Sequence, residues 1–217
     1  KIGNLIFVVW QFILLAALSS GIILFGIALI YGTTGTIFYA DIMGKMEMNM
    51  LQIVALVFFL SGLAFKISLV PFHFWTADVY EGSPVNVAAY LSVVSKGASV
   101  FVLIILLFTV FKEMFLAWEI MLYALAVITM TMGNIFALRQ QNIQRFLAFS
   151  SIAQAGFILL GVINGTEYGM ATVIYFVLVY VFSNLGAFGV VSVVNNNVGK
   201  LNIDDYRGFY QTNPRLS

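Results

Sequence analysis

Long apolar runs separated by short polar stretches dominate the chain from its first residues to about residue 194. About 20 consecutive apolar residues are enough for a helix to cross the hydrocarbon core of a bilayer. Six runs reach that length, and we expect each to be a transmembrane helix: residues 5–31, 51–76, 84–111, 116–138, 143–163 and 170–194. Runs this long without polar alternation exclude a transmembrane barrel. The pattern therefore predicts an all-α polytopic membrane domain over residues 1–194.

The last stretch of the chain, residues 195–217, is polar and begins with three consecutive asparagines. Its charged residues include Asp204, Asp205, Arg207 and Arg215. We expect it to be an extramembrane segment.

The chain starts at Lys1 rather than at a methionine and enters an apolar run almost at once. That run is too long for the core of a signal peptide, and no soluble domain follows it. We interpret the chain as an internal or split part of a longer protein.

The amino-acid composition also indicates that the chain is surrounded by lipid rather than by water. The chain is 62% hydrophobic and only 9% charged, whereas a soluble domain carries about a quarter charged residues. The net charge of +1 gives no electrostatic reason to expect nucleic acid as a partner. The chain has no cysteine and one histidine, which excludes cysteine-ligated clusters and argues against a multi-histidine metal or haem site. We therefore expect no metal, no cofactor and no catalytic redox residue in this chain.

Basic residues divide unequally if the six helices alternate in direction. One side of the membrane receives Lys1, Arg139, Arg145, Lys200, Arg207 and Arg215, and the other receives only Lys45 and Lys112. Loops rich in lysine and arginine stay on the cytoplasmic side. We expect the loop around Arg139 and both termini on the cytoplasmic or matrix side.

Two lysines lie deep inside predicted helices: Lys66 within residues 51–76 and Lys96 near the middle of residues 84–111. A lysine at mid-membrane costs roughly 2.5–3.5 kcal/mol on insertion scales. Burial disfavours the charged form, so such an amine can exchange a proton near neutral pH. We expect both lysines to carry protons. The alternative is a static ion pair with an acid from another chain or from a missing part of this one.

Pro71 predicts a break in the second helix, because it has no N–H for the carbonyl of Ile67 and clashes with it. Lys66 then lies in the last turn before the break, where the negative end of the half-helix favours a cation. Broken helices that carry an ionisable group are common at transporter ion sites. The alternative is a proline kink that serves packing alone.

Three further polar residues follow the break. His73 is either a proton relay, since the unperturbed pKa of histidine is about 6.5, or a neutral side chain that satisfies a carbonyl freed by Pro71. Asp78 and Glu81 are most simply part of a solvated turn before Pro84. They could also cap a helix or form the mouth of a proton entry path.

Three stretches carry a family resemblance: residues 65–84 (FKISLVPFHFWTADVYEGSP), residues 133–152 with GNI at the start and NIQRFLAFSSI at the end, and residues 183–189 (SNLGAFG). Their order and spacing, from about residue 11 to residue 214, resemble subunit 2 of mitochondrial complex I, called subunit N in bacteria. The stretch from Asp78 to Pro84 favours subunit 2 over the paralogous subunits 4 and 5.

The resemblance implies an antiporter-like fold of fourteen helices with two inverted five-helix repeats, of which this chain is similar to helices six to eleven. Lys66 matches the family lysine on broken helix seven, and Lys96 matches the lysine on helix eight. The resemblance thus implies that both lysines are members of a lateral proton-transfer axis. The family's glutamate on helix five and lysine on helix twelve lie outside this sequence. Gln154 stands where bacterial members usually carry a histidine, and glutamine cannot titrate.

We therefore expect a fragment or split half of a proton-translocating membrane-arm subunit of respiratory NADH:ubiquinone oxidoreductase. The resemblance implies that flavin, iron–sulfur clusters, NADH and quinone are bound by other subunits. It also implies partners: other membrane-arm subunits, a chain or segment with the missing helices, and lipid such as cardiolipin. The alternatives are a subunit of a multisubunit cation/proton antiporter or membrane-bound hydrogenase, and a non-pumping structural scaffold.

The composition also bears on location. Twenty-one phenylalanines, three prolines and no cysteine favour an AT-rich coding genome. This favours the mitochondrial inner membrane, with a bacterial plasma membrane as the alternative.

Overall fold

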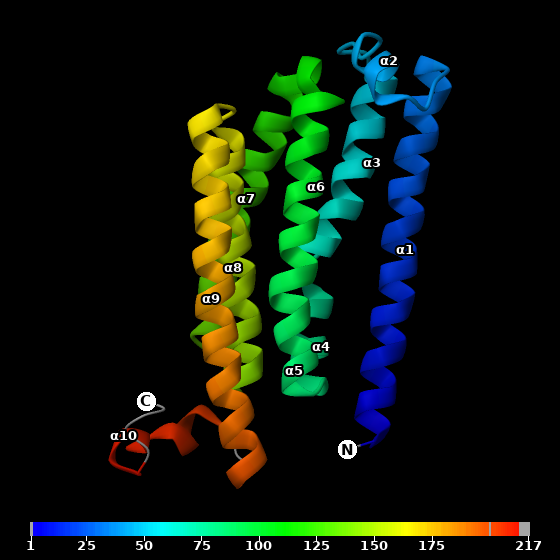
Figure 1. Cartoon of the computed structure of the whole chain (residues 1–217). Coiled ribbons are helices and arrows are strands. Elements are labelled where there is room, and N and C mark those ends of the chain that lie inside the picture. Colours follow the sequence, from blue (N-terminus) through cyan, green and yellow to red (C-terminus); the bar gives the residue numbers. More distant parts are fainter. Residues whose placement is uncertain (1, 200, 213–217) are drawn as a thin grey trace.

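The computed structural model describes residues 2–199 and 201–212, and this part of the chain is a bundle of long helices (Figure 1). Six of its helices are long and apolar enough to cross a membrane. They are α1 (Ile2–Thr34), α3 (Met50–Ile67), α7 (Phe115–Ala137), α8 (Ile143–Ile163), α9 (Glu167–Val198) and a composite helix that ends in α6 (Lys96–Thr109). The predicted all-α membrane fold is confirmed.

Shorter elements complete the described part. The composite helix consists of α5 (Val85–Tyr90), a π-helical turn (Leu91–Ser95) and α6. The remaining elements are α2 (Tyr39–Met43), α4 (Phe74–Gly82), 3₁₀ turns at Lys112–Met114 and Ile203–Tyr206, and α10 (Phe209–Thr212). Neither α2 nor the π-helical turn was predicted from the hydrophobic pattern.

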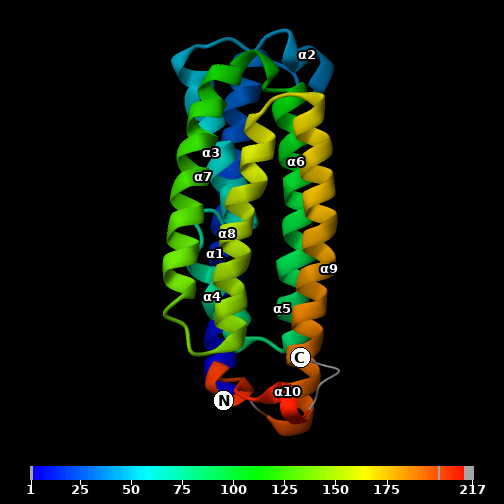
Figure 2. The same cartoon turned by 90° about the vertical axis from the view of Figure 1, so that its left-hand side faces the viewer.

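The helices alternate in direction, as the charge argument requires. The start of α1 and the short α10 lie at one end of the bundle, and α2 lies at the other (Figures 1 and 2). The connection between α7 and α8, which contains Arg139, lies at the same end as α10 (Figure 2). Lys1, Lys200 and Arg215 lie outside the described residues. Which end faces the cytoplasm or matrix stays a prediction.

Asparagine or threonine caps the start of three long helices, α3, α8 and α9, and glycine caps the end of α9. The Asn142 side chain accepts from the backbone N–H groups of Gln144 and Arg145, and Thr166 accepts from that of Gly169, which satisfies first-turn donors. Gly199, with a φ of 69°, ends α9 in a left-handed turn.

The end of α9 differs from the prediction. The helix continues through the three asparagines to Val198, so the boundary expected at residue 194 lies four residues too early. Asparagine weakens a helix interior only mildly, whereas a left-handed glycine stops it. Two residues that follow Gly199 make backbone hydrogen bonds to the start of α8, each at 2.8 Å. The Leu201 carbonyl accepts from the Ile143 N–H, and the Ile203 N–H donates to the Gln141 carbonyl. The tail is therefore attached to the start of α8.

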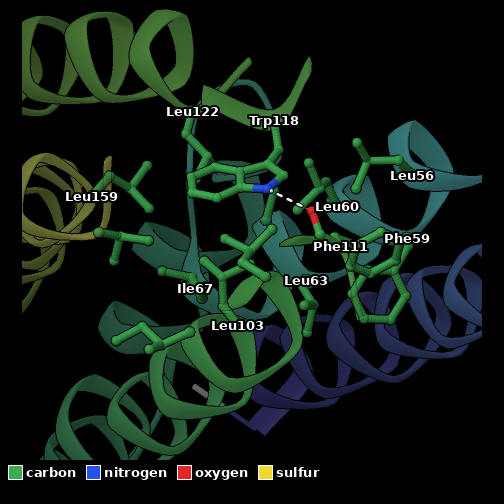
Figure 3. Packing of buried hydrophobic residues seen from close by; sticks show 14 of the residues in the cluster. Leu56, Phe59, Leu60, Leu63, Ile67, Leu103, Phe111, Trp118, Leu122 and Leu159 are labelled. Atoms are coloured by element: carbon green, nitrogen blue, oxygen red, sulfur yellow. Dashed lines mark hydrogen bonds between the residues drawn. The ribbon is translucent and has the colours of Figure 1, made fainter. Parts of the chain in front are cut away.

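One of the two apolar core clusters among the described residues lies where α3, α6 and α7 meet (Figure 3). The Trp118 indole is fully buried among Ile67, Leu103 and Leu122, and its N–H donates to the Phe111 carbonyl at 3.0 Å. Lipid tails are as apolar as leucine, so close packing and satisfied hydrogen bonds stabilise this core more than transfer out of water does.

Close contact between α7 and α8 depends on a small residue. A Cβ added at Gly133 would lie 2.7 Å from the Ala153 backbone nitrogen, which is nearer than van der Waals contact allows. Small residues at such crossings let helix backbones approach in lipid. Gly133 thus sets the spacing of the two helices.

We predict that Gly133→Ala destabilises the protein by about 1–3 kcal/mol, because the backbones must separate. The measurement is the melting temperature of the protein within its purified assembly. Gly186→Ala is the matched control, since a Cβ there meets no atom of the described chain within 4 Å. Equal melting temperatures for the two variants would contradict the prediction.

Candidate functional site

The break between α3 and α4 begins before the proline. Helix α3 ends at Ile67, and its C-cap Ser68 has a left-handed φ of 66°. The Leu69 N–H donates to the Ala64 carbonyl at 2.8 Å. Helix α4 begins after His73. The predicted break at Pro71 is therefore confirmed, but the last residue of the helix, Ile67, lies four residues before the proline. A residue before proline avoids the helical conformation, and the Ser68 cap turns the chain away first.

Polar side chains from other parts of the chain satisfy the backbone of the break. The Val70 N–H donates to the Thr129 hydroxyl of α7 at 3.0 Å, and the Trp75 indole N–H donates to the Phe65 carbonyl at 3.0 Å. Unpaired backbone groups at membrane depth are tolerated only beside protein or water. These two bonds hold the break in a fixed place.

Lys66 lies in the last turn of α3, as predicted. Its side chain is half-buried. Within residues 2–199 and 201–212 its amine makes no hydrogen bond or ion pair. The carbonyl end of α3 is thus the nearest favourable charge that the helix itself offers.

Lys96 is buried in the bundle, with 3% of its surface exposed. It is the first residue of α6, directly after the π-helical turn. Its amine donates to the Ser151 hydroxyl of α8 at 2.7 Å, and that hydroxyl donates to the Ala148 carbonyl at 2.7 Å. The Tyr80 ring centroid lies 5.8 Å from the amine, within cation–π range.

The surroundings of Lys96 contain no counter-charge among the described residues. A serine hydroxyl and an aromatic ring orient a protonated amine without neutralising it, and a buried unpaired charge is costly. A void of about 10 Å³ is lined by Lys96 together with Ile67 at the end of α3, Ser151 and Tyr180. Its size approaches that needed for one water molecule.

Buried polar atoms without hydrogen-bond partners gather in the break and in α4. In the described part of the chain they are the Ser68 hydroxyl, His73 Nδ1, the Thr76 hydroxyl and the Tyr80 hydroxyl. Buried polar groups in proteins are normally matched by protein or ordered water. All four atoms lie in the segment from Ser68 to Tyr80, so this segment carries hydrogen-bonding groups that the described chain leaves unmatched.

His73 lies at the start of α4 and is 4% exposed. Its ring stacks against Phe136 of α7 and meets the edge of Phe149 of α8. His73 does not line the void beside Lys96. Both interpretations of this residue, as a relay and as a neutral structural group, stay open.

Asp78 and Glu81 bind Arg145 at the start of α8. The Arg145 Nη1 atom lies 2.6 Å from an Asp78 carboxylate oxygen and 2.8 Å from one of Glu81. The interpretation of this stretch as a solvated turn is wrong, because α4 continues to Gly82 and carries both acids. Neither acid is a helix cap. Their role at a proton entry path stays a prediction.

Gln154 lies one turn after Ser151 on α8 and is half-buried. It lines a cleft of about 250 Å³ between α8 and α9, together with Ser150, Ser183 and Asn184. Four polar side chains in one cleft are unusual for a contact between two membrane-spanning helices. An amide there can orient water but cannot titrate.

Three residues of the site were missed in the sequence: Tyr80, Ser151 and Tyr180. Ser151 and Tyr180 lie within apolar stretches, where a hydroxyl is easily interpreted as packing, and Tyr80 lies between the two acids Asp78 and Glu81, which are the more conspicuous residues of that stretch. Ser151 lies in the NIQRFLAFSSI stretch that carries the resemblance. Only the packing of α4, α8 and α9 against α6 brings the three toward Lys96.

Residues 9–217 match the protein family described as NADH:quinone oxidoreductase/Mrp antiporter, transmembrane. The chain belongs to this family. Among its curated relatives, NADH-quinone oxidoreductase subunit N of Phocaeicola vulgatus is 52% identical over 208 residues, which are 95% of this chain and 44% of the relative. NAD(P)H-quinone oxidoreductase subunit 2 of a Picosynechococcus species is 45% identical over 95% of this chain and 40% of the relative. The chain thus spans less than half the length of these family members.

Solved structures of the family share the fold. A chain of respiratory complex I from Thermus thermophilus is 32% identical, with a TM-score of 0.79 over 99% of this chain and 46% of that one. A chain of the archaeal membrane-bound sulfane sulfur reductase is 27% identical, with a TM-score of 0.83 over 94% of this chain and 42% of that one. A chain of the Mrp complex from a Dietzia species is 26% identical, with a TM-score of 0.84 over 91% of this chain and 37% of that one.

The ion pairs between α4 and α8 give a prediction for this member of the family. Arg145→Met should lower stability by about 1–2 kcal/mol, because two neighbouring carboxylates lose their shared cation. The melting temperature of the intact assembly reports the change. Arg207→Met is the control, since Arg207 is 84% exposed in its pair with Asp204. A loss no greater than that of the control would show that the α4–α8 pairs contribute nothing.

Proposed function

We propose that this chain is part of a proton-translocating membrane-arm subunit of an NADH:quinone oxidoreductase. The observation that supports it best is Lys96: an amine 3% exposed at the centre of a predicted membrane helix, bonded to a neutral hydroxyl, with no carboxylate partner among the described residues. Such a group is costly as a permanent charge and suited to gaining and losing a proton.

In this proposal Lys96 Nζ holds a proton and passes it on. Ser151 accepts a hydrogen bond from the amine, and the Tyr80 ring favours its charged form. Lys66 accepts protons at the carbonyl end of α3, where it pairs with an acid outside this chain. His73 is a lower-ranked intermediary, and Asp78 and Glu81 border an entry path. No step requires Gln154 to titrate.

The wider assembly is also a proposal. Flavin, iron–sulfur clusters, NADH and quinone are bound by other subunits, and redox chemistry there drives proton movement here. The partners are other membrane-arm subunits, a chain or segment that supplies the remaining helices, and lipid. The mitochondrial inner membrane expected from composition is a proposal as well, and the bacterial relatives named above support the plasma-membrane alternative.

We predict that Lys96→Met lowers the number of protons pumped per electron by more than half, because methionine fills the site without a titrating group. The measurement is proton uptake and NADH oxidation by the intact complex in vesicles. Lys112→Met is the control, since Lys112 is exposed in the 3₁₀ turn between α6 and α7. An unchanged ratio in Lys96→Met would support the structural-scaffold alternative instead.

Ser151→Ala should slow pumping severalfold without abolishing it, because the charged amine loses its hydrogen-bond acceptor and not its ability to titrate. Ser99→Ala is the matched control: Ser99 lies on the same helix as Lys96, but its hydroxyl donates to the Ser95 carbonyl of its own helix. Equal rates in the two variants would exclude a role for Ser151.

A subunit of a cation/proton antiporter is the second candidate. The likeness to the Mrp complex, with a TM-score of 0.84, favours it, and the 52% identity to a quinone oxidoreductase subunit favours the first. Purification of the native assembly separates the two. Co-purifying NADH:quinone oxidoreductase subunits would support the first, and antiporter subunits in their place would support the second.

A further inference from the structure

Two hollows share one tyrosine in their linings. The inner one is the void of about 10 Å³ beside Lys96. The outer one is the cleft of about 250 Å³ between α8 and α9. In the part of the chain that the structure describes, Tyr180 is the one residue that lines both.

The Tyr180 side chain is buried, with 8% of its surface exposed. Its hydroxyl donates to the Ser92 carbonyl at 3.0 Å. Ser92 lies in the π-helical turn that leads directly into Lys96. A π-helical turn disturbs the regular backbone ladder and often marks a functional site. A single hydrogen bond therefore links α9 to the backbone that positions Lys96.

Polar side chains lie at both hollows. On the inner side α8 presents Ser151, which binds the Lys96 amine. On the outer side α8 presents Ser150 and Gln154, and α9 presents Ser183 and Asn184. The polar lining of the outer cleft is not needed for packing in lipid, and it suits water there. The inner void is lined mainly by apolar side chains, and Lys96 and Ser151 are its polar neighbours apart from Tyr180. The Tyr180 ring therefore lies between a cleft that can hold water and the residues that bind the proton.

We infer that Tyr180 is a positioning residue that separates the Lys96 void from the α8–α9 cleft, held in place by its bond to Ser92, and that rotation of its side chain joins the two into one water passage. This inference rests on the proposed role of Lys96 as a proton carrier. Side-chain rotation of this kind needs no movement of the helices. Breaking the Ser92 bond also frees the π-helical turn, so opening the passage and releasing Lys96 are one event.

The chain contains no cysteine, so single cysteines can report where water reaches. Ala155→Cys places a thiol in the inner void, where Ala155 is 2% exposed. Ser183→Cys places one in the outer cleft. A thiol reacts as the thiolate, which needs water and is suppressed in apolar surroundings. Each reporter is treated with methyl methanethiosulfonate in the intact complex in vesicles, and its peptide is followed by mass spectrometry.

Tyr180→Ala should raise the labelling rate of the inner thiol at least tenfold, because the ring that covers it is removed. Tyr180→Phe keeps the ring and loses only the bond to Ser92, so a rise of about fivefold is expected. The outer thiol should react equally in every background. Tyr175→Ala is the control, since Tyr175 lies on the same helix but is 71% exposed, and it should leave both rates unchanged.

Equal labelling of the inner thiol in the unsubstituted background, in Tyr180→Phe, in Tyr180→Ala and in the control would overturn the inference. So would an outer thiol that never reacts, because the cleft would then hold no water. If Tyr180→Ala fails to assemble, Tyr180→Phe decides alone. The result is separable from the proposed function: normal pumping by Lys96→Met with labelling that still follows Tyr180 would reject the function and keep the passage. Lost pumping by Lys96→Met with unresponsive labelling would reject the passage alone.

Discussion

One constraint organises this structure: an ammonium group on Lys96 must be accommodated in the interior of a bundle that offers it no anion within the described residues. A neutral serine and an aromatic ring reduce the cost of the charge without fixing it. The same cost would be avoided by a leucine or methionine at this position, as in the rest of the helix. The site therefore makes physical sense only if the amine changes its charge state or meets a charge from outside this chain.

The break between α3 and α4 also contributes to the surroundings of Lys96. Ser68 caps the end of α3 next to the Lys96 void, since Ile67 lines that void. The bonds from Val70 to Thr129 and from Trp75 to Phe65 keep the break in place, and Arg145 holds α4 against α8. A rigid frame thus surrounds a segment with four unpaired polar atoms. Rigidity of the frame and polarity within it are what a defined water site requires.

Most of the fold can be predicted from the sequence, because the length and hydropathy of the apolar runs are strong signals in a membrane protein. The sequence also locates Lys66, Lys96 and the break, since a charge or a proline in an apolar run is conspicuous. The residue at which the break starts could not be predicted from the sequence, because it depends on the left-handed conformation of Ser68 rather than on Pro71. Nor does the sequence show that Asp78 and Glu81 share Arg145, because that pairing joins residues more than sixty positions apart. Tyr80, Ser151 and Tyr180 become recognisable only when tertiary packing brings them around Lys96.

The most direct test of the account is an experimental structure of the intact assembly at a resolution that shows ordered water around the Lys96 amine. The account predicts water within hydrogen-bonding distance of Lys96 Nζ and of the unpaired hydroxyls of α4, and no carboxylate within 4 Å of that nitrogen. A dry site, or a carboxylate from a neighbouring segment held in a fixed pair with Lys96, would contradict it.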